Sequence, residues 1–451
     1  MDVIHHGAKD GVTGSCHELV LDFSCSVLID CGLFQGNESR DLTIEFDVSN
    51  IKALVVTHCH VDHIGRIPWL LAAGFRGPIY CTQASAALLP IVLEDALKVH
   101  FSSRRMFDAI KPLLSKQIVP VNYNVKQVVP LNSDLPFSIR FQQAGHILGS
   151  AYVECFLPNG EVGVFSGDLG PSNTPLLPDP IPPKFADWLV IESTYGSKVH
   201  EDIASRRVRL KQVLEKSLQD GGAILIPAFS IGRTQELLFD LEQLIYELPK
   251  SEVARIPVVL DSPLANKFTE SYREFRSLWS KEAKEKIING RHPLDFEQLV
   301  TINSHKKHLA LVNRIKHSAE PVIVIAASGM LTGGRIVDYM KALLADERTD
   351  VLLVGYQAKG TPGRDLFKGR PIVEFNDESV EVKAQIHKLN GYSAHADANE
   401  LTDFVSKIDG LKKVRLIHGE PKSQLKLKER LLEVLSNVDI ELACEVPNIM
   451  N

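Results

Sequence analysis

Long apolar runs are missing from this chain of 451 residues. No stretch approaches the roughly 18 apolar residues that a membrane-spanning helix needs, so we expect no association with a membrane. The start of the sequence lacks the basic segment and the apolar segment of a secretory signal. The seven cysteines are scattered without a Cys-x-x-Cys pair, which indicates reduced thiols and no disulfide framework. These absences predict a cytoplasmic protein.

An excess of positive charge is also missing, because 56 acidic residues outnumber 50 basic ones and give a net charge of −6. This balance argues against indiscriminate binding to polyanions, although a local basic rim around bound cations would still suffice for a nucleic acid. The hydrophobic content of 44% is that of an ordinary globular protein. The length predicts about two to four domains.

The most unusual stretch of the sequence follows a short apolar run at residues 53–56, which predicts a buried strand. Directly after it come His58, His60, Asp62 and His63, and these are ligand types that borderline divalent metals take. A solvated histidine-rich turn would explain any one of these residues but not the set. His58 and His60 point the same way in an extended loop. Two pairs of ligands leaving one loop fit two neighbouring ions better than one.

His-x-His-x-Asp-His after a buried strand resembles the metal signature of the metallo-β-lactamase superfamily. The resemblance implies an αββα sandwich with the ions at one edge. Hydrolases of thioesters, lactams and phosphodiesters share this signature, so it does not indicate the substrate.

Three further candidates stand at or near the ends of predicted strands. Asp30 ends a strand of a predicted hairpin, and the resemblance implies that it supports the site through hydrogen bonds; an ordinary turn aspartate is the alternative. His146 lies in a Gly-rich turn between predicted strands and is the best candidate for a third imidazole on the first ion. Asp168 ends another strand and resembles the superfamily's bridging aspartate, whose two oxygens each face one ion.

The middle of the chain has a different pattern, in which four apolar runs, typical of buried strands, alternate with stretches that predict helices. These runs lie at residues 223–226, 257–260, 322–325 and 351–354. The pattern predicts a parallel sheet covered on both faces, and such sheets bind ligands in the loops that follow the strands. The candidates for substrate binding in these loops are Ser230, Arg233, Ser328 and Gln357. Residues 230–234 also open a helix that would hold a phosphate, with helix capping and a solvated arginine as an equal alternative.

The last part of the chain contains two histidines at predicted strand exits. His395 precedes a capping box formed by Asp397 and Glu400, which predicts the start of a helix. His418 follows the strand predicted at residues 413–417. Both histidines are expected at the same edge as the metal loop.

Glu192, His395 and His418, in this order around a long insertion, resemble the three additional motifs of the β-CASP nucleases, a branch of the metallo-β-lactamase superfamily. The strings at residues 391–397 and 328–331 are the most specific, and the resemblance covers essentially the whole chain. It implies an α/β protein in which a β-CASP domain with a parallel, Rossmann-like sheet is inserted into the sandwich. The expected boundaries are 1–194 and 375–451 for the metallo-β-lactamase domain and 195–374 for the insertion.

Position by position, the resemblance implies two zinc ions, with manganese as the alternative. The implied ligands are His58, His60 and His146 for one ion, Asp62, His63 and His418 for the other, and Asp168 between them. Two such ions activate a water molecule for attack on phosphorus. A histidinium is the side chain best matched to protonate the leaving oxygen near neutral pH. His395 fits that role, Glu192 would orient its ring, and Asp62 is counted with them as catalytic.

The leading hypothesis is a zinc-dependent endoribonuclease that acts on single-stranded RNA between sandwich and insertion, as a monomer or homodimer, with 5′-exonuclease activity left open. A DNA phosphodiesterase is the alternative among nucleases. The resemblance disfavours it, because a histidine at the position of His418 is typical of the RNA-cutting members of the family. A small-molecule hydrolase of the glyoxalase II type is disfavoured by the insertion and by the Glu192–His395 pair. An inactive RNA-binding scaffold is disfavoured because all seven implied ligands are present.

Overall fold

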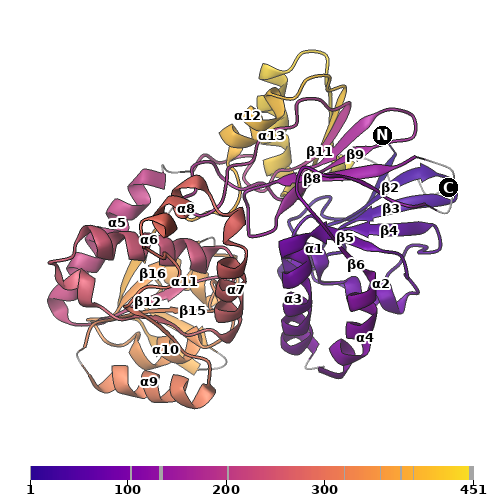
Figure 1. Cartoon of the computed structure of the whole chain (residues 1–451). Helices are drawn as coiled ribbons and strands as arrows, with labels where there is room; N and C mark the ends of the chain where they lie inside the picture. Colours follow the sequence, from indigo (N-terminus) through magenta and orange to yellow (C-terminus); the bar gives the residue numbers. More distant parts are fainter. Residues whose placement is uncertain are drawn as a thin grey trace. The chain divides into compact units, whose positions relative to one another are not determined.

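The computed structural model describes residues 2–101, 104–131, 136–200, 203–318, 320–355, 357–375, 378–389 and 391–445. The chain divides into two compact units (Figure 1). The first consists of Met1–Ser172, Pro178–Val199 and His395–Asn451, and the second of Asn173–Leu177 and His200–Ala394. Within the described residues, no helix is long and apolar enough to cross a membrane.

The first unit contains a sheet in the order β1-β2-β3-β4-β5-β6. Its strands are β1 (Val3–Gly7), β2 (Cys16–Asp22), β3 (Cys25–Ile29), β4 (Ile51–Val55), β5 (Ile79–Thr82) and β6 (Ile118–Val121). β2 and β3 form the predicted antiparallel hairpin, whereas β3 to β6 run parallel to one another. Parallel neighbours place the ends of β3 and β4, and therefore the loops that follow them, at one edge of the sheet.

A second sheet of this unit has the order β21-β20-β11-β10-β9-β8-β7. Its strands are β7 (Lys126–Val128), β8 (Ser138–Gln143), β9 (Ala151–Phe156), β10 (Val162–Phe165), β11 (Trp188–Glu192), β20 (Lys413–Ile417) and β21 (Asp439–Leu442). β20 pairs in parallel with β11, and Ile417 is the partner of Glu192. The pairing puts the tips of two strands that are distant in sequence next to each other.

The two sheets share an apolar core, to which Leu19 and Val55 contribute from the first sheet and Val153 and Phe165 from the second. Helices cover the outer faces, so that Leu401 and Leu427, for example, pack against the outer side of the second sheet. The helices are α1 (Val61–Ile64), α2 (Ile67–Ala72), α3 (Gln83–Phe101), α4 (Arg104–Gln117), α12 (Ala398–Ser406) and α13 (Pro421–Val434). The expected αββα sandwich is confirmed.

The second unit is built on a fully parallel sheet in the order β14-β13-β15-β12-β16-β19. Its strands are β12 (Ala223–Pro227), β13 (Val258–Leu260), β14 (Leu299–Thr301), β15 (Val322–Ala326), β16 (Asp350–Leu353) and β19 (Gln385–Lys388). Figure 1 shows helices on both sides of this sheet, which confirms the predicted doubly covered arrangement.

The helices of the second unit are α5 (Ile203–Asp220), α6 (Arg233–Glu247), α7 (Pro263–Glu274), α8 (Lys281–Ile288), α9 (His305–His317), α10 (Ile336–Leu343) and α11 (Pro362–Phe367). A small hairpin consists of β17 (Ile372–Phe375) and β18 (Glu378–Glu381). Short 3-10 helices in the two units are η1 (Gly36–Glu38), η2 (Glu252–Arg255), η3 (Arg276–Leu278) and η4 (Ala443–Glu445).

The division of the structure differs from the boundary expected at residue 375, because the second unit continues to Ala394. β19 pairs in parallel with β16, with Leu352 opposite His387, and is therefore the last strand of the second unit's sheet. The return to the sandwich was expected before this strand, at residue 375. The second unit also begins a few residues later than expected, at His200, and includes the short segment Asn173–Leu177.

Candidate metal centre

The loop that follows β4 is fixed to the end of β3 by Asp30. The backbone N–H and the hydroxyl of Thr57 donate to the two oxygens of Asp30, at 2.8 and 2.7 Å, and His63 Nδ1 lies 2.8 Å from Asp30 Oδ2. A Cβ atom at Gly32 would collide with the carbonyl oxygen of Asp62. Glycine at position 32 is therefore what allows the turn after β3 to approach the metal loop so closely.

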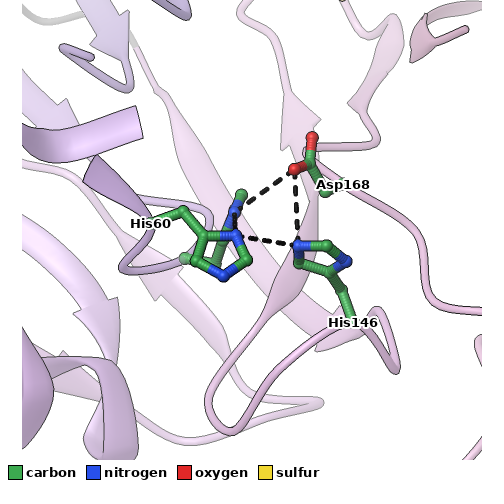
Figure 2. A group of neighbouring side chains, drawn as sticks. His60, His146 and Asp168 are labelled. Carbon is green, nitrogen blue, oxygen red and sulfur yellow. Dashed lines mark hydrogen bonds and ion pairs between the residues drawn. The ribbon is translucent and has the colours of Figure 1, made fainter. Parts of the chain in front are cut away.

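One group of side chains converges from this loop and from the turn before β9. His58 Nε2 and His146 Nε2 lie 3.1 and 3.0 Å from His60 Nδ1, and each lies 3.4 Å from Asp168 Oδ2. Figure 2 shows the rings of His60 and His146 beside the carboxylate of Asp168. The four ligand atoms are all within 4.8 Å of one another. Such convergence of ring nitrogens and one carboxylate oxygen is what a divalent cation requires.

A second group consists of Asp62, His63 and His418, whose ligand atoms also lie within 4.8 Å of one another. His418 Nε2 is 3.3 Å from His63 Nε2 and 3.5 Å from Asp62 Oδ2. Asp168 Oδ1 lies 3.3 Å from His63 Nε2 and 3.6 Å from His418 Nδ1. The carboxylate of Asp168 thus has Oδ2 toward the first group and Oδ1 toward the second.

His418 reaches the site because β20 lies beside β11. Its backbone N–H donates to the carbonyl of Ala8 at 2.8 Å, and its φ angle of 48° turns the chain sharply at the tip of the strand. Thr194 Oγ1 lies 3.1 Å from His418 Nδ1 and donates to the His418 carbonyl at 3.1 Å. These contacts fix the imidazole at the same edge as the loop after β4.

Glu192 and His395 form a pair next to both groups. Glu192 is fully buried, accepts a hydrogen bond from the Leu169 N–H at 2.7 Å, and has its two oxygens 3.1 and 3.2 Å from His395 Nδ1. His395 Nε2 lies 3.9 Å from Asp168 Oδ2. The backbone after His395 is held by the predicted capping box, which is confirmed: Asp397 caps α12 and Glu400 accepts from its N–H.

Burial and nearby carboxylates set the charges of these histidines. Burial lowers the pKa of His60 to about 3 and holds the pKa values of His58 and His146 below the ordinary value. Burial also opposes the charged form of His395, but the charges of Glu192 and then Asp168 outweigh it and raise the pKa of His395 to about 9. The first group therefore offers neutral imidazoles, whereas His395 carries a proton at neutral pH.

The residues present fit bound divalent cations. In the first group, His60 Nδ1 faces two other ring nitrogens at 3.0–3.1 Å. A neutral ring nitrogen has either one proton or one lone pair, so hydrogen bonding cannot satisfy both contacts. Asp168 Oδ1 is buried and accepts no hydrogen bond among the described residues. A buried carboxylate oxygen of this kind is satisfied by a cation. The mixture of imidazole and carboxylate donors suits zinc and its neighbours in the first transition row.

Comparison with known proteins assigns the chain that carries this site to a family. Models of the metallo-beta-lactamase superfamily, the Beta-Casp domain and the Zn-dependent metallo-hydrolase RNA specificity domain match residues 16–227, 234–366 and 379–442. A protein named Ribonuclease TTHA0252, from Thermus thermophilus, is 36% identical over 449 residues, which cover 98% of this chain and 98% of that protein. The chain belongs to the β-CASP family of the metallo-β-lactamase superfamily. As a member of this family it is a metal-dependent hydrolase.

Other β-CASP relatives are longer than this chain. Proteins named transcription termination factor FttA, from Methanocaldococcus jannaschii and Methanococcus maripaludis, are each 32% identical over 423 and 424 residues. In both cases the match covers 87% of this chain and 63% of the relative. The chain thus spans less than two thirds of the archaeal proteins.

The four β-CASP residues predicted to bind substrate lie in the second unit, in the segments that follow β12, β15 and β16, and Arg233 is the first residue of α6. Arg233 Nη1 donates to the carbonyl of Val354, and Ser328 Oγ accepts from the Thr332 N–H. Gln357 is only 2% exposed and donates to the carbonyls of Gly329 and Gly355. The Gln357 amide therefore ties two of these segments together, whereas Ser230 and Arg233 remain partly exposed.

Two threonines of the β-CASP site were not singled out from the sequence. Thr57 binds Asp30, and its hydroxyl lies 3.1 Å from His58 Nδ1. Thr194 contacts His418 in the same way. Thr57 directly precedes the candidate ligand His58, and Thr194 lies two residues after Glu192 at the end of β11. Their positions beside candidate residues were the signal in the sequence.

Proposed function

We propose that this β-CASP protein is a ribonuclease that hydrolyses phosphodiester bonds of single-stranded RNA with two zinc ions. The observation that carries the proposal is the Glu192–His395 pair beside a carboxylate, Asp168, that faces both ligand groups. Hydrolysis of an ester with a poor leaving group needs such a proton donor. The relative named ribonuclease, aligned over nearly all of both chains, supports RNA as the substrate.

The cations would be held by the side chains whose ligand atoms converge. These are His58, His60 and His146 for one ion, Asp62, His63 and His418 for the other, and Asp168 for both. When bound, two such ions acidify a water molecule and neutralise non-bridging phosphate oxygens. Asp30 would keep His63 in place, since its carboxylate binds both the ring and Thr57.

His395 would protonate the leaving oxygen from Nε2, because its Nδ1 is directed at Glu192. The raised pKa of about 9 keeps this proton in place at neutral pH. Buried Glu192 orients the ring. Burial opposes the charge of Asp62, but the hydrogen bond with His418 outweighs it and lowers the pKa of this carboxylate. Ionised and partly exposed, Asp62 would hold a cation and orient the attacking water rather than take its proton.

The test is cleavage of matched 5′-labelled RNA and DNA oligonucleotides by the zinc-loaded protein. We expect cleavage of RNA, with internal fragments if the enzyme is an endonuclease and 5′ mononucleotides if it removes residues from the end. Equal cleavage of DNA would favour the phosphodiesterase alternative. Inactivity on both polymers, with thioester hydrolysis that persists in His395→Ala, would favour a glyoxalase II type of hydrolase.

A further inference from the structure

A buried chain of hydrogen bonds lies behind the candidate metal centre, in the first unit. Arg415 Nη1 lies 3.3 Å from His5 Nε2, His5 Nδ1 lies 2.9 Å from His17 Nδ1, and His17 Nε2 lies 3.0 Å from Ser15 Oγ. All four side chains belong to residues that are at most 5% exposed. His5 and His17 are direct partners in the pairing of β1 with β2. None of these residues is among the proposed ligands.

The chemistry of the guanidinium gives this chain one direction. Arg415 can only donate, so His5 Nε2 must accept and carry no proton. A neutral His5 then has its proton on Nδ1 and donates it to His17 Nδ1. His17 in turn has its proton on Nε2 and donates to Ser15 Oγ. Because Ser15 Oγ accepts from His17, its hydroxyl proton can be donated to a further acceptor.

Both imidazoles are neutral in this arrangement, as their surroundings require. Burial, followed by the charge of Arg415, lowers the pKa of His5 to about 3. Burial, followed by the neighbouring histidines, holds the pKa of His17 well below its ordinary value. A second proton on His5 would put a cation against a guanidinium inside the protein, which is unfavourable.

The chain ends on a small cavity between the two sheets. Ser15 and His17 line it together with Asp30, Asp168 and the ligand candidates His63 and His418. It offers about 10 Å³ to the centre of a water molecule, which is the room that a single buried water needs. Asp168 Oδ1 accepts no hydrogen bond among the described residues, and its two lone pairs allow it to face a cation and still accept from a water. A water in the cavity would accept from Ser15 and donate to a carboxylate.

We propose that Arg415, His5, His17 and Ser15 form a relay, meaning a chain of hydrogen bonds with one fixed direction, and that this relay holds a buried water against the carboxylates of the metal centre. The four are positioning residues: they direct a donor toward Asp168 and Asp30 and fix these carboxylates for cation binding. Partners of metal ligands commonly alter metal affinity by about 10- to 100-fold. The role in cation binding rests on the proposed two-metal site, whereas the direction of the relay does not.

The direction is tested on the unaltered, zinc-loaded protein by nitrogen-15 NMR of labelled histidines. His5→Gln and His17→Gln serve only to assign the signals. We expect opposite neutral tautomers, with the proton on Nδ1 in His5 and on Nε2 in His17. The same tautomer in both, or a cationic ring in either, would overturn the relay. A high-resolution crystal structure should show one water within hydrogen-bond distance of Ser15 Oγ, and a dry cavity would remove the end of the relay.

The effect on the metal centre is tested by zinc affinity, measured by competition with a chelator. Ser15→Ala and His17→Phe should each weaken zinc binding by about tenfold. Ser15→Thr, which keeps the hydroxyl, should restore most of the affinity. Ser26→Ala is the matched control, because it removes a buried hydroxyl from β3 outside the relay.

Equal zinc affinity in Ser15→Ala, His17→Phe and Ser26→Ala would contradict the positioning role. Neither the tautomers nor the zinc affinity depends on RNA. A protein that binds zinc and shows these tautomers but cuts no RNA would leave the relay intact and refute the proposed function.

Discussion

At the scale of the residue, the two groups of ligand candidates differ in what controls their charge. Burial dominates in His58, His60 and His146, whose pKa values are lowered. In His63 and His418 burial is outweighed by carboxylates, Asp168 foremost, so their pKa values are raised. The second group therefore has protons to release when a cation binds, as metal ligation in general requires.

The sequence was most informative for residues that cluster in a short motif. The loop from His58 to His63 provided four candidate metal ligands, because three imidazoles and a carboxylate seldom occur so close together in a sequence without binding a metal. His5 and His17, by contrast, have no candidate partner nearby in sequence. Their contact depends on the register of β1 against β2, which no local pattern specifies.

His395→Ala should separate chemistry from binding. His395 is not among the proposed ligands, so zinc content and RNA affinity should stay near those of the unaltered protein. The rate of cleavage should fall by about 10²- to 10⁴-fold, because the proton donor is lost. Single-turnover kinetics and zinc analysis check both parts, with His387→Ala in the second unit as the control. Near-normal turnover would remove His395 from the role of acid.

Glu192→Gln should change the pH dependence of cleavage. The raised pKa of His395, about 9, means that its proton is present below that pH and lost as the pH rises through it. Loss of the Glu192 charge removes the largest influence that raises this pKa. The alkaline limb of the rate profile should therefore move down by about one to three pH units. An unmoved limb in kcat/KM would show that another group supplies the proton.

At the scale of the element, many strands could be predicted, whereas their pairing with strands distant in sequence could not. β12, β15 and β16 are apolar runs between helices, which is typical of a parallel sheet buried on both faces. β19 reads Gln-Ile-His-Lys and is an edge strand, so its mixed composition gave no sign of which sheet it joins. The pairing of β11 with β20 likewise joins segments that only the complete fold brings together.

Asp397→Ala should weaken the start of α12 and, through it, the placement of His395. The Asp397 carboxylate accepts from the N–H groups of Asn399 and Glu400 at 2.8 and 3.0 Å. Loss of such a cap costs about 1 kcal/mol in the free energy of unfolding. We expect that loss in denaturant titrations, together with slower cleavage at normal zinc content. Asp403→Ala, at an exposed site on the same helix, is the control and should change neither.

At the scale of the whole molecule, the candidate centre belongs to one unit although its residues come from both ends of the chain. Every proposed ligand, together with Asp30, Glu192 and His395, lies in the first unit. The sheet of the second unit is made entirely of its own strands. Metal binding should therefore stabilise the two units unequally.

Removal of metal by a chelator should lower the melting temperature of the first unit alone. A ligand that binds only the folded state stabilises it by about 2.7 kcal/mol at 100 times its dissociation constant. Calorimetry should show two transitions, of which only one shifts. Trp279 is buried in the second unit and Trp188 in the first, so fluorescence of Trp279→Phe can assign the shifting transition. Equal shifts of both would contradict a centre confined to the first unit.

The most direct test of a two-cation ribonuclease is elemental analysis of the purified protein alongside cleavage of 5′-labelled RNA, with Asp168→Ala beside it. The structure gives Asp168 one oxygen toward each ligand group, so its loss should disturb both ions at once. We predict two zinc ions per chain and RNA cleavage in the unaltered protein, and the loss of both together in Asp168→Ala. Full zinc content in Asp168→Ala, or cleavage by a protein free of metal, would contradict the account.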